Sequence, residues 1–149
     1  MQLKNYPTAP LSRRILAMAY DGLVLVAMYI IFGGLLVTAV SKAMGLEEFV
    51  RLTPAQAASV FYIISFLYYS HSWRRGGQTI GMKAWRIYVT TLDGTPIRLS
   101  HCMLRSATGL FSLVIVGLGY FWMLIDKKER TWHDIASLTR VVYRPKGVE

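Results

Sequence analysis

The residues most able to do chemistry are charged side chains that lie in or beside apolar segments. Asp21 is the only formal charge in the apolar run 15–40, Arg14 immediately precedes that run, and Asp134 lies in the C-terminal tail. A carboxylate near the centre of a bilayer costs on the order of 2.5 to 3.5 kcal/mol, so it is tolerated where it faces protein or water, or is protonated. Asp21 therefore has three readings: a group that moves a proton or ion, a polar pin between helices, or a passive protonated acid.

Arg14 and Asp21 have a spacing that places them on one face of a helix. They are seven residues apart, close to two turns, so their side chains project about 10 Å apart along the axis. Helical side chains lean toward the N-terminus, so Arg14 leans away from Asp21. We expect Arg14 to extend to the lipid headgroups. We expect the partner of Asp21 to come from another segment or from trapped water.

Asp134 belongs to a second motif in the tail. Thr131 and Asp134 have the spacing of a capping box, which predicts a short helix through Ser137. Asp134 could also pair with a cytoplasmic arginine such as Arg14, and the two roles are compatible. Such a pair would tie the tail to the mouth of the first helix. His133 beside it suggests a metal-dependent hydrolase pair, but no other ligand has a suitable spacing, so we expect no metal.

Two apolar segments are expected to position these residues across a membrane. Residues 15–40 would form a helix of roughly 39 Å, which exceeds the ~30 Å hydrocarbon core. Residues 54–73 carry no formal charge. They follow Thr53, which with Gln56 forms a capping box around Pro54 at the first helical position. We predict two firm transmembrane helices.

A third apolar stretch, 106–125, is just long enough to cross once. The N-terminal lead holds three Lys/Arg, the first loop two, the segment 74–105 six and the tail six. By the positive-inside rule the N-terminus, the 74–105 loop and the tail all favour the cytoplasm. A single crossing would leave the tail outside. We therefore favour a re-entrant hairpin broken at 117–119 over a third span.

Strand patterns indicate a small cytoplasmic β element. Residues 86–91 alternate apolar and polar side chains and lead into the turn Asp93-Gly94 and then 95–99, which predicts a hairpin. Pro96 restricts the second strand to an edge or a bulge. The run 139–143 could complete a three-stranded sheet. The fold class is thus an all-α membrane protein of one domain, 1–149, with two firm spans, a third hydrophobic helix or re-entrant hairpin, and a small cytoplasmic β-hairpin or sheet.

The composition restricts the class of partner. The net charge is +9, and almost every basic residue flanks an apolar stretch. This favours anionic lipid headgroups over nucleic acid as the partner. The single cysteine excludes an intramolecular disulfide, and we expect no cofactor. We also expect no enzymatic activity, because no grouping of nucleophile, base and orienting residue is visible.

Three stretches together resemble one family. Arg14 with Asp21, then GGQTIGMKAWRIYVTTLDGTPIRL from 76 to 99, then DKKERTWHDIASLTRVV from 126 to 142, are similar to the RDD family of bacterial membrane proteins, named for one arginine and two aspartates. Arg14 matches the family arginine and Asp21 the first aspartate. Asp134 matches the second aspartate better than Asp126 does.

The resemblance also points to secondary positions. These are His133 in the tail block and Gly77, Gln78 and Gly81 in the glycine block, where Met82 departs from the family pattern by preceding Lys83. The resemblance implies a multi-pass protein of the bacterial cytoplasmic (inner) membrane with a cytoplasmic N-terminus. For function it implies transport and, in some members, cation/proton exchange.

Two functions are compatible with these residues. The first is transport or cation/proton coupling through Asp21, with a small ion or proton as the partner. So few spans make an oligomer necessary for it. The alternative is a non-transporting scaffold or accessory subunit whose basic cytoplasmic face docks lipid or protein. Asp21 lining a hydrated cavity would favour transport, whereas Asp21 sealed against an arginine or hydroxyl would favour the scaffold.

Overall fold

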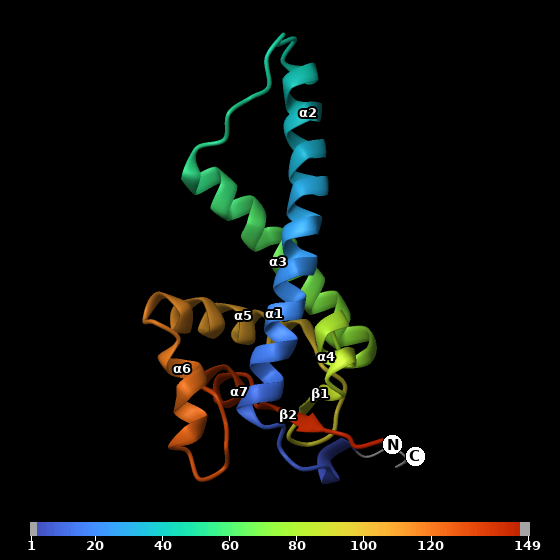
Figure 1. The fold of residues 1–149 in the computed structure, drawn as a ribbon, viewed down its shortest axis with the longest axis vertical. Coiled ribbons are helices and arrows are strands. Elements are labelled where there is room, and N and C mark those ends of the chain that lie inside the picture. The colour runs from blue at the N-terminus through green and yellow to red at the C-terminus, as the bar shows by residue number, and fades with distance from the viewer. Residues whose placement is uncertain (1–2, 147–149) are drawn as a thin grey trace.

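A computed structural model of the chain describes residues 3–146, and one long helix dominates it (Figure 1). The helix comprises α1 (Leu11–Met28), a π-helical turn η2 (Tyr29–Gly33) and α2 (Gly34–Ala43). It begins after Pro10, earlier than expected, because residues 11–14 also adopt helical geometry. Within the described residues it is the one helix both long and apolar enough to cross a membrane.

The second predicted span is a helix, α3 (Pro54–Gly76). The capping box of Thr53 and Gln56 is confirmed, and Gly77 ends the helix in the left-handed conformation. Its apolar character is weaker than we expected, because serines, tyrosines and His71 interrupt it, and it does not qualify as a span by hydropathy. The helix is confirmed, but its assignment as a firm span is not. The ring of Phe61 contacts that of Tyr29 at a centroid distance of 5.7 Å.

The sheet differs from the predicted hairpin. β1 (Ile87–Thr91) pairs antiparallel with β2 (Thr139–Tyr143), with Val89 opposite Val141. The predicted return strand at 95–99 is wrong. Pro96 lies in a loop there, and the next helix already begins at Leu99. The predicted tail strand is confirmed as the partner of β1.

The N-terminal lead contacts the sheet. It contains a 3₁₀ turn, η1 (Leu3–Asn5), and Thr8 forms an antiparallel bridge with Val142. The backbone N–H of Ala9 donates to the carbonyl of Val141 at 2.9 Å. The lead therefore lies along the free edge of β2.

The third apolar stretch is a bent pair of helices. α5 (Leu99–Val114) is followed by α6 (Leu118–Phe121) and the 3₁₀ turn η3 (Trp122–Leu124), with a bend of 109° between them. Val116 and Gly117 adopt positive φ at the bend. The predicted break at 117–119 is confirmed to within two residues, and the stretch is not one straight helix.

Two short helices complete the fold, α4 (Ile80–Ala84) and α7 (Trp132–Ala136). A small apolar core joins the N-terminal half of α1 to α4 and the sheet. It includes Ala17, Met82 and Val89. Figure 1 shows these elements gathered around the N-terminal part of the long helix, while α2 extends away from them.

Candidate functional site

Asp21 lies at the contact between α1, α3 and α4. Its Oδ1 accepts hydrogen bonds from the Tyr68 hydroxyl at 2.7 Å and from the Gly81 backbone N–H at 2.8 Å. Its Oδ2 accepts from the Thr79 hydroxyl at 2.5 Å. The residue is 1% exposed. The partner of Asp21 therefore comes from other segments, as predicted, and the carboxylate is sealed by hydroxyl and amide donors.

Gly81 allows this close approach. A Cβ on Gly81 would come nearer to the carbonyl oxygen of Ala17 than real Cβ atoms come to any neighbour, and it would also press on the carboxyl of Asp21. The local helix start brings the amide into place, because Thr79 caps α4 by accepting from the N–H of Met82 at 3.2 Å. The predicted secondary position Gly81 thus belongs to the Asp21 site.

Asp134 forms a second, buried site at the N-terminal end of α1. Its Oδ2 lies 2.6 Å from Nη1 of Arg14, and its Oδ1 lies 2.7 Å from Nη1 of Arg105. The capping box with Thr131 is also present, so the two roles predicted for Asp134 are both confirmed. Arg14 does not extend to headgroups as expected. Its side chain is buried within the protein, and its Nε donates to the carbonyl of Ala9 at 3.0 Å.

The electrostatics of this site follow from its burial. Burial by itself would raise the pKa of Asp134, but the guanidinium groups of Arg105 and Arg14 outweigh it and hold that pKa well below its ordinary value. Burial lowers the pKa of the adjacent His133 to about 3, so its imidazole is neutral near pH 7. The ring of His133 packs against that of Tyr120 at a centroid distance of 4.7 Å and an interplanar angle of 56°. The site is therefore a fixed ion triad of one carboxylate between two arginines.

Arg105 was not predicted. It also donates to the hydroxyl of Thr139, and its guanidinium lies 5.0 Å above the ring of Trp73. The sequence offered only the spacing of Cys102, Arg105 and Ser112, which places them on one helical face; the structure shows that this face is buried. We had counted Arg105 as part of a basic loop. Tyr68 and Thr79 were likewise missed, and only the N-cap preference of threonine could have indicated Thr79.

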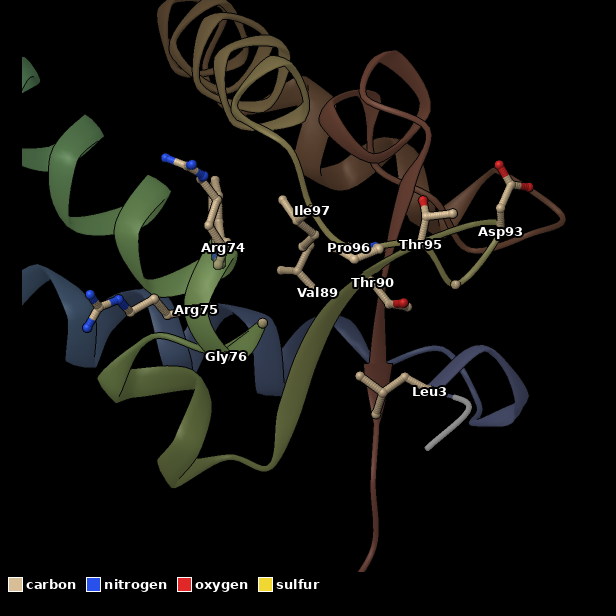
Figure 2. Close-up of a pocket in the computed structure, with 13 residues that line it drawn as sticks. Leu3, Arg74, Arg75, Gly76, Val89, Thr90, Asp93, Thr95, Pro96 and Ile97 are labelled. Atoms are coloured by element: carbon tan, nitrogen blue, oxygen red, sulfur yellow. The ribbon is translucent and has the colours of Figure 1, made fainter.

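The remaining predicted positions lie elsewhere. Asp126 pairs with Arg130 at 3.0 Å, which lowers the pKa of Asp126 to about 2, and it takes no part in the Arg14 site. Gln78 Nε2 donates to the carbonyl of Ile87 at 2.9 Å. Gly77 borders a pocket of about 360 Å³ between the end of α3 and β1. Figure 2 shows Val89 and Ile97 lining that pocket, with Arg75 directed away from it.

The two sites share α1 but use different partners. Asp21 binds α1 to α3 and α4, whereas Arg14 binds α1 to α5 and α7 through Asp134. No cluster of three metal-ligating side chains occurs among residues 3–146. In both sites the carboxylate oxygens accept from donors on other elements, whereas Nε of Arg105 and Nδ1 of His133 are buried without a hydrogen-bond partner among the described residues.

Comparison with known proteins gives one match. A model of the RDD family matches residues 8–137, which include Arg14, Asp21 and Asp134. No curated protein and no solved structure matches the chain.

Proposed function

We propose that this chain, which belongs to the RDD family, is a non-transporting membrane scaffold, in which Asp21 pins helices together and Asp134 fastens the tail to them. One observation carries this proposal. All three contacts of the Asp21 carboxylate come from Tyr68, Thr79 and Gly81 of the same chain, and the residue is 1% exposed. A carboxylate in this setting has donors for both of its oxygens and no need of an ion.

The distribution of polarity supports a membrane setting. Charged residues such as Arg14 and Asp21 are buried within the protein, whereas apolar residues on the same long helix, such as Leu23 and Ile30, are exposed on its surface. A water-soluble protein rarely exposes so large a contiguous apolar surface. In a bilayer the arrangement is favourable, because acyl chains cover the apolar side chains and buried polar groups satisfy one another.

We assign the topology from the same reasoning. The long helix crosses the membrane, and α3 provides the second crossing despite its serines. The N-terminus and the sheet then lie in the cytoplasm by the positive-inside rule, and the membrane is the bacterial inner membrane. Exposed basic residues on that side, including Lys127 and Lys128, would attract anionic headgroups. No catalytic role is proposed.

Cation/proton coupling through Asp21, within an oligomer, is the second candidate. The observation that favours it is a titratable side chain on the one strongly apolar helix of the described chain. Coupling would require Asp21 to leave its three donors during transport. The scaffold requires no such movement.

Proteoliposomes distinguish the two. We would measure cation-driven proton flux for the native chain, Asp21→Asn and the matched surface variant Asp126→Asn, together with the thermal unfolding of each. The scaffold predicts flux equal to that of empty liposomes for all three and a lower unfolding temperature for Asp21→Asn alone. A native flux that disappears in a still folded Asp21→Asn protein would overturn the proposal in favour of coupling.

A further inference from the structure

α5 has its polarity reversed relative to a helix of a soluble protein. Its buried residues are Cys102, Arg105 and Ser112. Val114 is nine residues from Arg105, about half a turn round the helix, and is 73% exposed. The outward face otherwise carries the apolar side chains of Leu99, Met103, Leu104, Ala107, Leu110 and Phe111, together with the exposed Ser100. The outward face of α5 thus carries no charge, and its inward face holds a buried arginine.

The direction of that face is set by what lies beneath the helix. The inward face rests on α7 and β2, because Arg105 bonds Asp134 and Thr139. Figure 1 shows α5 running across the long helix, with α7 on one side of it and α2 extending on the other. The apolar face is therefore directed toward the side on which α2 extends.

The length and the bend argue against a direct crossing by this pair. α5 has 16 residues, about 24 Å of helix, which is shorter than the ~30 Å hydrocarbon core. The chain then turns by 109° at residues 115–117. Backbone at such a break is not stable when it faces lipid at mid-membrane depth. A shallow position avoids that cost.

We propose that α5 lies flat at the surface of the bilayer on the side of the sheet, with its apolar face in the acyl-chain boundary of that leaflet. The assignment rests on the proposed function, since it takes the long helix as a span. The occupant is lipid, because the outward face of α5, like the surface of the long helix formed by Leu23, Val26 and Ile30, is apolar, exposed and free of charge. Arg98 at the start of α5 and Lys127 beyond η3 would place positive charge at the headgroups.

Depth measurements on the full chain in vesicles of mixed zwitterionic and anionic phospholipid test this. Spin labels would be placed at Met103→Cys, Ala107→Cys, Leu110→Cys and Val114→Cys, all on the outward face. Leu23→Cys and Val26→Cys in α1 and Ile30→Cys in η2 form the matched set on the long helix, called the α1 set below. Cys102 is fully buried, and the unsubstituted chain measures its background labelling. Relaxation by oxygen and by a water-soluble nickel chelate then gives the depth of each label.

The expected result is one shallow depth for all four α5 labels and a steady increase along the α1 set, about 1.5 Å per residue in a helix along the membrane normal. An increase of that kind along α5 would overturn the inference by making α5 a crossing helix. Labels open only to the aqueous reagent would overturn it too, and so would labels closed to both reagents, which would indicate a second protein copy. Equal depths for all labels of the α1 set would instead show that the long helix does not cross the membrane, and this would refute the proposed function.

Discussion

Because Gly81 has no side chain, α4 comes close enough to α1 for the Gly81 backbone N–H to donate a hydrogen bond to Asp21. We predict that Gly81→Ala destabilises the protein by about 1 to 3 kcal/mol, as overpacking of a close contact does, because the new Cβ would press on the Ala17 carbonyl. Thermal unfolding in detergent would measure it. Gly22→Ala, one residue from Asp21, has no neighbour within 4 Å and should be neutral or stabilising. Equal effects of the two substitutions would contradict the close approach.

His133 makes the stability depend on pH. Burial lowers its pKa from 6.5 to about 3, so between these values the unfolded chain binds a proton that the folded chain does not. Stability should therefore fall as the pH drops from 6.5, by up to about 1.4 kcal/mol per pH unit for this group. His133→Gln should flatten the slope measured by unfolding at pH 4 to 7. The exposed His71→Gln is the matched control, and a slope unchanged by His133→Gln would refute the assignment.

Among the elements, the α5–α6 bend depends on positive φ at two successive residues. Gly117 has φ of 74°. We expect Gly117→Ala to cost about 1 kcal/mol or more, because an L side chain is strained there. Gly109→Ala, inside α5, meets its nearest neighbour at 3.8 Å and should stabilise by up to about 1 kcal/mol. In thermal unfolding we expect a lower unfolding temperature for Gly117→Ala and a higher one for Gly109→Ala. A lower unfolding temperature for both variants would contradict the prediction.

The elements also show which sequence signals were sufficient. The caps at Thr53 and Thr131 were predictable, because a capping box is specified within four residues. The predicted hairpin after Asp93 was wrong, because the tail strand 139–143 pairs with β1 in place of the segment that follows the turn. The local turn signal could not indicate this long-range pairing. The break at 117–119 was predicted from the charge balance of the tail.

The buried sites were only partly predictable for a related reason. Asp21 and Asp134 are conspicuous because a charge in or near an apolar segment requires an explanation. Their partners Tyr68 and Arg105 come from distant segments, and nothing local distinguishes them from interfacial residues. Hydrophobic pattern locates a buried acid, whereas identifying its donors requires the arrangement of the helices.

Over the whole molecule, Asp134 joins segments from both ends of the chain. It bonds Arg14 near the N-terminus and Arg105 in α5, and its own helix α7 leads into β2, which pairs with β1 and with the lead at Thr8. Removing its charge would leave two buried arginines without their common partner. Disruption of a buried ion pair typically costs about 3 to 5 kcal/mol, a large share of the stability of an ordinary domain.

We therefore predict that Asp134→Asn loosens the N-terminal lead, α5 and β2 together. Hydrogen exchange in detergent would detect it as faster exchange at Ala9, at residues 102–106 and at Val141 in the same variant. Asp126→Asn is the matched control, because the pair that it breaks with Arg130 is near the surface and its loss should be small and local. If Asp134→Asn loosened only α7, the triad would be a helix cap with no wider role. Faster exchange in all three segments would identify Asp134 as the contact through which both ends of the chain are held to the first helix.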